Sequence, residues 1–127
     1  MNEAKYSYKN LDVYKEAKIL VMMVYKLLKQ FPKEEQYALC DQLRRAVISI
    51  PSNVAEGSGR TSMKDQAHFI EIAFGSLMEV DCQMDIAHDL GYITQNELDT
   101  ICPQISRIAA MLSVMRNKCL QRSVVNR

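Results

Sequence analysis

Residues 94–119, which read TQNELDTICPQISRIAAMLSVMRNKC, indicate the fold class most clearly. Apolar residues recur in this stretch at spacings of three and four, the pattern of a helix that packs along one seam. They are Leu98, Ile101, Ile105, Ile108, Leu112, Met115 and Cys119. Thr94 followed by Glu97 forms a capping box, which marks a helix start. The stretch therefore predicts a helix over 95–122.

Three earlier segments show the same spacing and predict helices over 12–30, 33–56 and 63–90. The expected core stripe is Tyr14, Ala17, Val21, Val24, Leu28 and Phe31 in the first, Cys40, Leu43, Val47, Ile50 and Val54 in the second, and Ala67, Ile70, Phe74, Leu77, Met84 and Ala87 in the third. No segment alternates with a period of two for long enough to predict a strand. The fold class is therefore all-α.

Residues with strong positional preferences stand near the expected helix ends. Asp12 and Pro32 suit the starts of the first two helices, and Ser62 suits the start of the third. Gly57 and Gly91 suit the ends of the second and third helices. Short connections between long helices favour antiparallel neighbours, so we predict an up-down-up-down four-helix bundle forming one domain over residues 1–127.

Two prolines fall inside expected helices, Pro51 in the second and Pro103 in the fourth. Each lacks a backbone donor, so it either kinks its helix or divides it in two. We predict a kink at Pro51, because the apolar stripe continues in register from Ile50 to Val54. Ser49 and Asn53 flank this proline, and we expect them to satisfy freed carbonyls and to set the register of the bundle.

Composition excludes several classes of protein. The chain has 127 residues, 48% of them hydrophobic, and a net charge of +1, so it is neither disordered nor a disulfide scaffold. No segment resembles a signal peptide or is apolar enough to span a membrane. The four cysteines, Cys40, Cys82, Cys102 and Cys119, are far apart and lie in helical patterns. We therefore predict reduced thiols and a cytoplasmic location.

The sequence offers little that points to catalysis. Asp85-x-x-His88 resembles half of a di-iron motif, but the second pair and the further inward carboxylates are missing. Gly57-Ser58-Gly59-Arg60 has backbone amides that suit a phosphate, although a helix cap explains these glycines better. Cys119 has no histidine in its own segment to activate it. We predict no enzyme, no metal and no cofactor.

Charge is distributed unevenly along the chain. Residues 61–103 contain one lysine and eight acidic residues, whereas residues 104–127 contain five basic residues and no acidic one. The first and fourth helices are expected to be neighbours, which would merge their basic surfaces, with the acidic third helix diagonally across from the first. This pattern fits an ordinary solvated surface, a face that tracks a nucleic-acid backbone, or opposed faces that join copies head to tail.

Each of the last two interpretations names candidate residues. The candidates for nucleic-acid binding are Lys26, Arg107, Arg116, Lys118 and Arg122, followed by Arg44, Arg45 and Arg60. Arg127 adds to the basic count of the last segment. The candidates for contact between copies are Asp81, Asp85 and Asp89. Few aromatic residues accompany the basic ones, so contacts to phosphates are expected rather than stacking on bases.

Residues 43–60, LRRAVISIPSNVAEGSGR, resemble the signature of the small four-helix-bundle family of 23S rRNA intervening-sequence proteins. Residues 8–17 (YKNLDVYKEA), 31–42 (FPKEEQYALCDQ), 72–79 (IAFGSLME) and 90–93 (LGYI) resemble further segments of that family, in its order. The likeness covers roughly residues 6–120. The signature positions matched are Arg44, Arg45, Pro51, Asn53, Glu56, Gly57 and Arg60.

The resemblance implies a bacterial antiparallel four-helix bundle that assembles as a ring, typically a homopentamer. It extends to a related branch, the accessory variability proteins of diversity-generating retroelements, which implies RNA, DNA or a reverse transcriptase as partners. It implies no catalytic residues. The expected function is a ring-forming scaffold that binds structured RNA, and the alternative is a module for protein interaction and self-assembly without nucleic acid.

Overall fold

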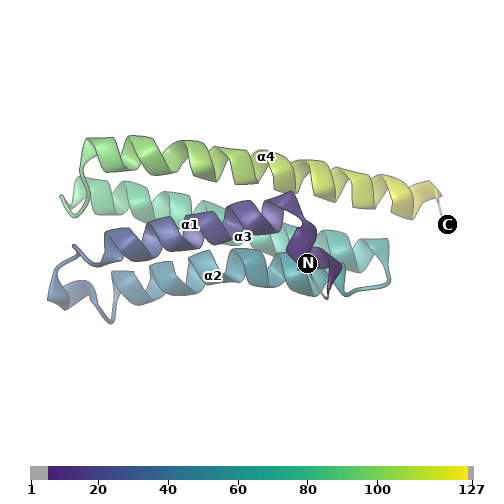
Figure 1. Ribbon diagram of the computed structural model, residues 1–127, viewed down its shortest axis with the longest axis horizontal. Coiled ribbons are helices and arrows are strands. Elements are labelled where there is room, and N and C mark those ends of the chain that lie inside the picture. The colour runs from purple at the N-terminus through teal and green to yellow at the C-terminus, as the bar shows by residue number, and fades with distance from the viewer. Residues whose placement is uncertain (1–5, 126–127) are drawn as a thin grey trace, which may run out of the picture.

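The computed structural model describes residues 6–125, and that part of the chain contains helices and no strand (Figure 1). The long helices are α1 (Asp12–Leu28), α2 (Leu39–Ser58), α3 (Met63–Asp89) and α4 (Gln95–Val125). Two short 3-10 helices, η1 (Ser7–Asn10) and η2 (Lys33–Glu35), precede α1 and α2. The predicted all-α class and four-helix bundle are confirmed.

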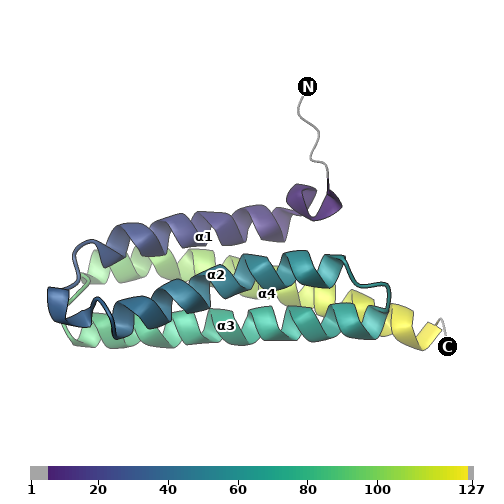
Figure 2. The same cartoon turned by 90° about the horizontal axis from the view of Figure 1, so that it is seen from below.

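Each long helix packs against its neighbours in the chain, and α4 also packs against α1. Between α2 and α3, Gln42 contacts Gln83 near one end, and Ser49 contacts Ser76 further along. The residue numbers thus run in opposite directions, so the two helices are antiparallel. The ribbon shows the same alternation from helix to helix, with α1 diagonally across from α3 (Figures 1 and 2).

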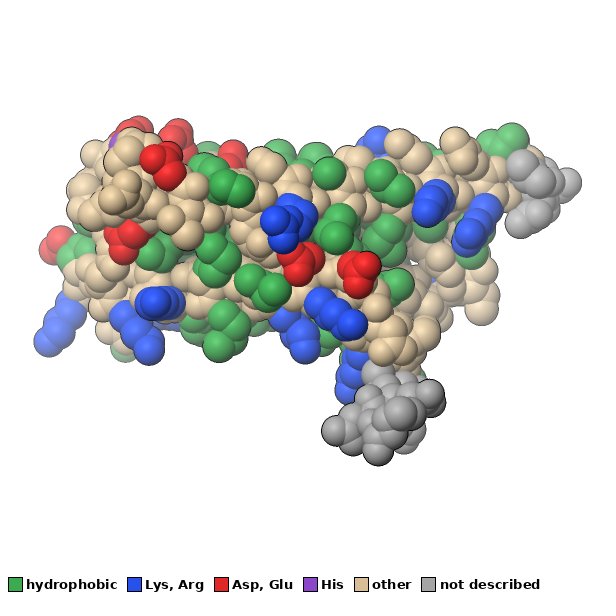
Figure 3. Space-filling model, turned by 45° about the horizontal axis from the view of Figure 1, so that its top comes forward, with side chains coloured by type: hydrophobic (Ala, Val, Ile, Leu, Met, Phe, Trp, Pro, Cys, Tyr) green, Lys and Arg blue, Asp and Glu red, His purple; other side chains and the backbone are tan. Residues whose placement is uncertain are grey.

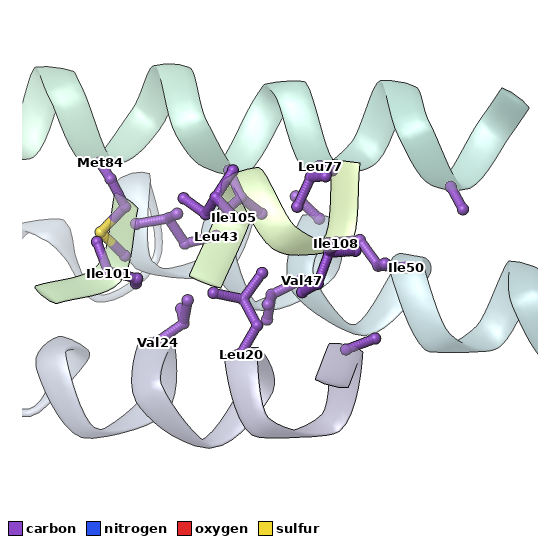
Figure 4. Close-up of a cluster of buried hydrophobic side chains, with 14 of the residues drawn as sticks. Leu20, Val24, Leu43, Val47, Ile50, Leu77, Met84, Ile101, Ile105 and Ile108 are labelled. Carbon is purple, nitrogen blue, oxygen red and sulfur yellow. The ribbon is translucent and has the colours of Figure 1, made fainter. Parts of the chain in front are cut away.

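The core lies along the bundle axis, where one stripe from each helix is buried. Figure 4 shows Leu20, Leu43, Leu77 and Ile108 pointing toward one another from the four helices. All four side chains are fully buried. Burying a leucine or isoleucine side chain stabilises a fold by about 1.5–3 kcal/mol, so these stripes supply most of the driving force for folding.

The core stripe of α1 differs from the predicted one at two positions. Val13 and Leu20 are buried, whereas Tyr14 and Val21 are only half-buried at the helix flank. The Tyr14 ring packs edge-on against Tyr8 at 5.0 Å and lies under the ammonium group of Lys18. A partly exposed position suits tyrosine because its hydroxyl can remain in water.

The second helix begins later than predicted, at Leu39 instead of residue 33. The backbone of Ala38 leaves the helical region, and residues 33–35 form η2. The Tyr92 hydroxyl donates a hydrogen bond of 2.7 Å to Glu35, and the Phe31 ring packs on the Tyr92 ring. This segment is therefore held against the α3–α4 turn, and these contacts outweigh the local preference for helix.

Some helix ends match the prediction and others do not. Thr94 and Glu97 form the predicted reciprocal capping box, and Ser62 Oγ accepts from the Asp65 amide. Gly91 has φ +80° and follows the end of α3, as expected. Asp12 is not a cap, because Leu11 occupies that position. The other ends fall within a few residues of the prediction, with α1 stopping at Leu28, α2 continuing to Ser58 and α4 reaching Val125.

Pro51 lies inside α2, which continues unbroken to Ser58. Division of this helix at the proline is therefore wrong, while the kink stays a prediction. The Asn53 amide donates to the Ser49 carbonyl and to Ser49 Oγ, both at 2.8 Å. Pro51 has no amide hydrogen to donate to the Val47 carbonyl, so this is the carbonyl that the proline leaves free. Asn53 binds the Ser49 carbonyl instead, which differs from the prediction.

Candidate nucleic-acid and assembly surfaces

The end of the signature segment forms the corner between α2 and α3. Gly57 is not the cap of α2 but lies inside it, where a Cβ would be 2.9 Å from Phe69 Cβ. Arg60 pairs with Glu56 at 3.4 Å, and its guanidinium lies 4.7 Å from the centre of the Phe69 ring. These contacts join the two helices, so Glu56, Gly57 and Arg60 have a structural explanation.

The same corner does not offer its backbone amides to a phosphate. The amides of Gly59 and Arg60 donate to the carbonyls of Glu56 and Gly57, at 3.1 Å each. This is also the carboxyl end of α2, which carries the negative end of the helix dipole. Phosphate binding by the Gly57–Arg60 segment is therefore disfavoured.

Pro51, Asn53 and Ser49 belong to two different surfaces of α2. Ser49 Oγ lies 2.8 Å from Ser76 Oγ of α3 and accepts from Asn53, which makes a polar link between the helices. Pro51 instead lines a groove on the side of α1. Ser49 thus links α2 to α3, and Asn53 holds Ser49 from within α2, while Pro51 lies on the opposite flank of the helix.

Three of the eight candidate cations are engaged in ion pairs within the chain. Arg44 pairs with Asp41 at 2.6 Å, and Arg60 pairs with Glu56 as described. Arg107 donates to Glu16 of α1 at 3.0 Å. A guanidinium that is already paired with a carboxylate attracts a phosphate less strongly, because the carboxylate offsets its charge, which makes these three weaker candidates.

The other five candidates are exposed and form no ion pair within residues 6–125. Arg116, Lys118 and Arg122 are close in sequence on the last turns of α4, and we call them the basic end of α4. Lys26 lies elsewhere, in a small groove between α1 and α4 that Glu97 also lines. Arg45 is on α2, which lies diagonally across the bundle from α4. Arg127 lies outside the described residues.

The acidic candidates Asp81, Asp85 and Asp89 are exposed and follow one another at intervals of four on α3. Burial raises the pKa of the Cys102 thiol in α4, and the nearby carboxylates of Asp81 and Asp85 raise it further. Asp81 and Asp85 therefore border α4 near its amino-terminal end. Along the upper part of Figure 3, acidic side chains gather toward the left end and basic ones toward the right, while further basic side chains lie at the lower left and further acidic ones near the centre.

An apolar groove that sequence reasoning missed lies between α1 and α2. It has a volume of about 740 Å³, and its apolar lining includes Met22, Ile48 and Pro51. Lys15 and Lys18 also line it, and no acidic residue does. Met22 is 71% exposed and Ile48 is 42% exposed, so two large apolar side chains of the lining remain in water. The sequence did contain one indication of this groove, because Met22 and Ile48 are apolar but lie outside the predicted core stripes.

The described residues contain no arrangement typical of a catalytic or metal site. Burial raises the pKa of the Cys40 and Cys119 thiols, as it does for Cys102, which makes them poor nucleophiles at neutral pH. Asp85 and His88 are not joined by further ligands, since no cluster of three metal-binding side chains occurs in residues 6–125. Over the same residues, every helix is too short or too polar to cross a bilayer.

Comparisons with known proteins identify the family of this chain. A family model described as 23S rRNA-intervening sequence protein matches residues 9–114. The fold is similar to that of a protein of unknown function from the S23 ribosomal protein family of Bacteroides thetaiotaomicron, with a TM-score of 0.74 and 20% identity over 82% of this chain and 97% of that one. No curated protein matches in sequence. Since the match to the family model covers α1, α2, α3 and most of α4, the chain belongs to the family of 23S rRNA-intervening sequence proteins.

Proposed function

We propose that this chain is a non-catalytic, ring-forming scaffold that binds structured RNA through the basic end of α4. The observation that carries the proposal is that Arg116, Lys118 and Arg122 lie within two turns of one helix end, with Lys118 and Arg122 on one side of the helix and Arg116 on another. These side chains are exposed, have no ion pair within the described residues, and belong to a segment without a single acidic residue. Such a surface attracts a polyanion, although the net charge of the whole chain is only +1.

The chemistry of this surface favours contacts to the phosphate backbone. Residues 104–127 contain no phenylalanine, tyrosine or tryptophan, so no aromatic ring is available there for stacking on a base. Arginine and lysine bind phosphates through charge-assisted hydrogen bonds. Such contacts give affinity and orientation but little choice of sequence, and structured RNA offers phosphates at close, fixed spacings.

We expect the Arg116→Glu/Arg122→Glu variant to lose measurable binding to a structured rRNA fragment at about 0.15 M salt, because two attractive contacts become repulsive. The measurement is fluorescence anisotropy with labelled RNA at several salt concentrations. For the unmodified chain, the logarithm of affinity should fall steeply with the logarithm of salt concentration. Removal of two phosphate contacts should reduce that slope by about two.

A matched control makes this measurement specific. Lys29→Glu/Lys33→Glu changes the net charge by the same amount at exposed positions of the opposite end of the bundle. This control should retain most of the RNA affinity. An equal loss in both variants would mean that only overall charge matters, and undiminished binding by Arg116→Glu/Arg122→Glu would exclude the basic end of α4.

A second function, self-assembly without nucleic acid, is supported by the acidic row on α3. Asp81 and Asp85 are exposed and form no ion pair within residues 6–125, so they are available to cations of another copy. We expect Asp81→Asn/Asp85→Asn/Asp89→Asn to lower the native mass while the helical circular dichroism is retained. An unchanged native mass would exclude these acids from the contact between copies.

A further inference from the structure

The groove between α1 and α2 has the features of a receptor for an amphipathic helix. Its apolar lining is formed by Met22, Ile48 and Pro51, and Lys18 lies at its side. Arg45 is exposed one turn before Ile48 on the same face of α2, which adds a second basic group. The part of α1 that lines the groove runs from residue 14 to 22, which is about 12 Å or two helical turns at 1.5 Å per residue.

Helix α3 presents the complementary surface on another side of the bundle. Met78, Cys82 and Ile86 follow one another at intervals of four, so they form one stripe, and all three are exposed. Asp81, Asp85 and Asp89 each stand three residues after a member of the stripe, and we call them the acidic row. Residues three apart are neighbours on a helix surface, so the acidic row borders the stripe. The stripe runs from residue 78 to 86, also about 12 Å, and therefore matches the groove in length.

We propose that the α3 stripe of one copy docks in the α1–α2 groove of a second copy, with the acidic row facing Lys18 and Arg45. This inference rests on the proposed self-assembly and assigns the two surfaces that perform it. Apolar side chains of the stripe would cover Met22 and Ile48, which the isolated chain leaves in water. The surrounding charges are opposite in sign, and this favours the correct partner and orientation.

The arrangement of the helices requires that the partner be another molecule. The stripe and the groove lie on different faces, because α3 is diagonally across from α1 (Figure 2). A helix therefore cannot dock in the groove of its own chain. The α1–α2 groove and the α3 stripe are different surfaces of each copy, so the contact is heterologous and joins copies in series.

Disulfide trapping tests this contact, because the native Cys82 lies in the stripe. We expect the Met22→Cys variant to form intermolecular disulfides with Cys82 of another copy when treated with diamide. These would appear as a ladder on a non-reducing gel, and peptide mass spectrometry would identify the disulfide between position 22 and Cys82. Adding Cys82→Ser should abolish the ladder. Val114→Cys, which places a thiol at a 53% exposed position of α4, should give only the background level.

Charge reversal supplies an independent measurement. Lys18→Glu/Arg45→Glu makes the groove acidic, and Asp85→Lys/Asp89→Lys makes the stripe basic. Each variant alone should associate roughly tenfold more weakly, since two ion pairs become repulsive. Mixing the two variants should restore association, because the acidic groove of one then faces the basic stripe of the other.

The results separate this docking from the broader proposal. If the unmodified chain has the native mass of a monomer, both self-assembly and the docking are wrong. If it is multimeric but the disulfide to Cys82 and the rescue on mixing are absent, the docking is wrong and self-assembly uses other surfaces. If Lys18→Glu/Arg45→Glu weakens RNA binding without changing the native mass, the groove binds nucleic acid and the docking is again wrong.

Discussion

The Leu112→Ala variant is expected to lower the free energy of unfolding by about 3 kcal/mol, because Leu112 is fully buried in the core stripe of α4. The loss combines the apolar surface no longer buried with the cavity left among the four helices. For a chain of this length, the melting temperature should fall by roughly 10 °C. Urea unfolding followed by circular dichroism measures the change.

The neighbouring Val114 provides a matched control on the same helix. Its side chain is exposed, so Val114→Ala should change the free energy of unfolding by no more than about 0.5 kcal/mol. Both variants must be compared at one protein concentration, because the proposed association between copies would stabilise the folded state. Similar losses in the two variants would contradict the inward orientation of this stripe.

The Gly57→Ala variant is expected to destabilise the bundle by about 1–2 kcal/mol, although alanine is the better helix former. The new Cβ would lie 2.9 Å from Phe69 Cβ and 3.4 Å from the Gln66 carbonyl oxygen. Phe69 Cβ is bonded directly to the backbone, so α2 and α3 must separate at their corner. Overpacking of this kind costs about 1–3 kcal/mol, which outweighs the roughly 1 kcal/mol gained in helix propensity.

Gly75 allows the same substitution without the close contact. It lies in α3 and is exposed, and a Cβ there would meet no atom within 4 Å. Gly75→Ala should therefore stabilise the chain by up to about 1 kcal/mol. A lower urea midpoint for Gly57→Ala and a higher one for Gly75→Ala would support close packing at the α2–α3 corner. A higher midpoint for both variants would show that the two helices separate there at little cost.

The sequence predicted the helices well because apolar spacing reports directly on which face is buried. It was less able to determine the rotation of α1, where Tyr14 and Val21 satisfy the spacing about as well as Val13 and Leu20. The start of α2 was missed for a different reason. The hydrogen bond between Glu35 and Tyr92 joins residues 57 positions apart, and no local pattern reveals it.

The candidate surfaces were predicted in part. The basic last segment and the acidic third helix were apparent from charge counts. Arg44 and Asp41 are three residues apart on one helix, a spacing at which opposite charges commonly pair. The pairing of Arg107 with Glu16 spans 91 residues and depends on the packing of α1 against α4. The α1–α2 groove was missed because spacing identifies the buried face of a helix but not how two neighbouring helices fit together.

The last turns of α4 project past the turn between α2 and α3 (Figure 2). Of residues 116–124, only Cys119 is buried, and the match to the family model ends at residue 114. Substitutions in this segment therefore change surface charge while leaving nearly all of the core intact. Under the proposed function, RNA affinity can therefore change at this end while the residues that make the bundle fold stay the same.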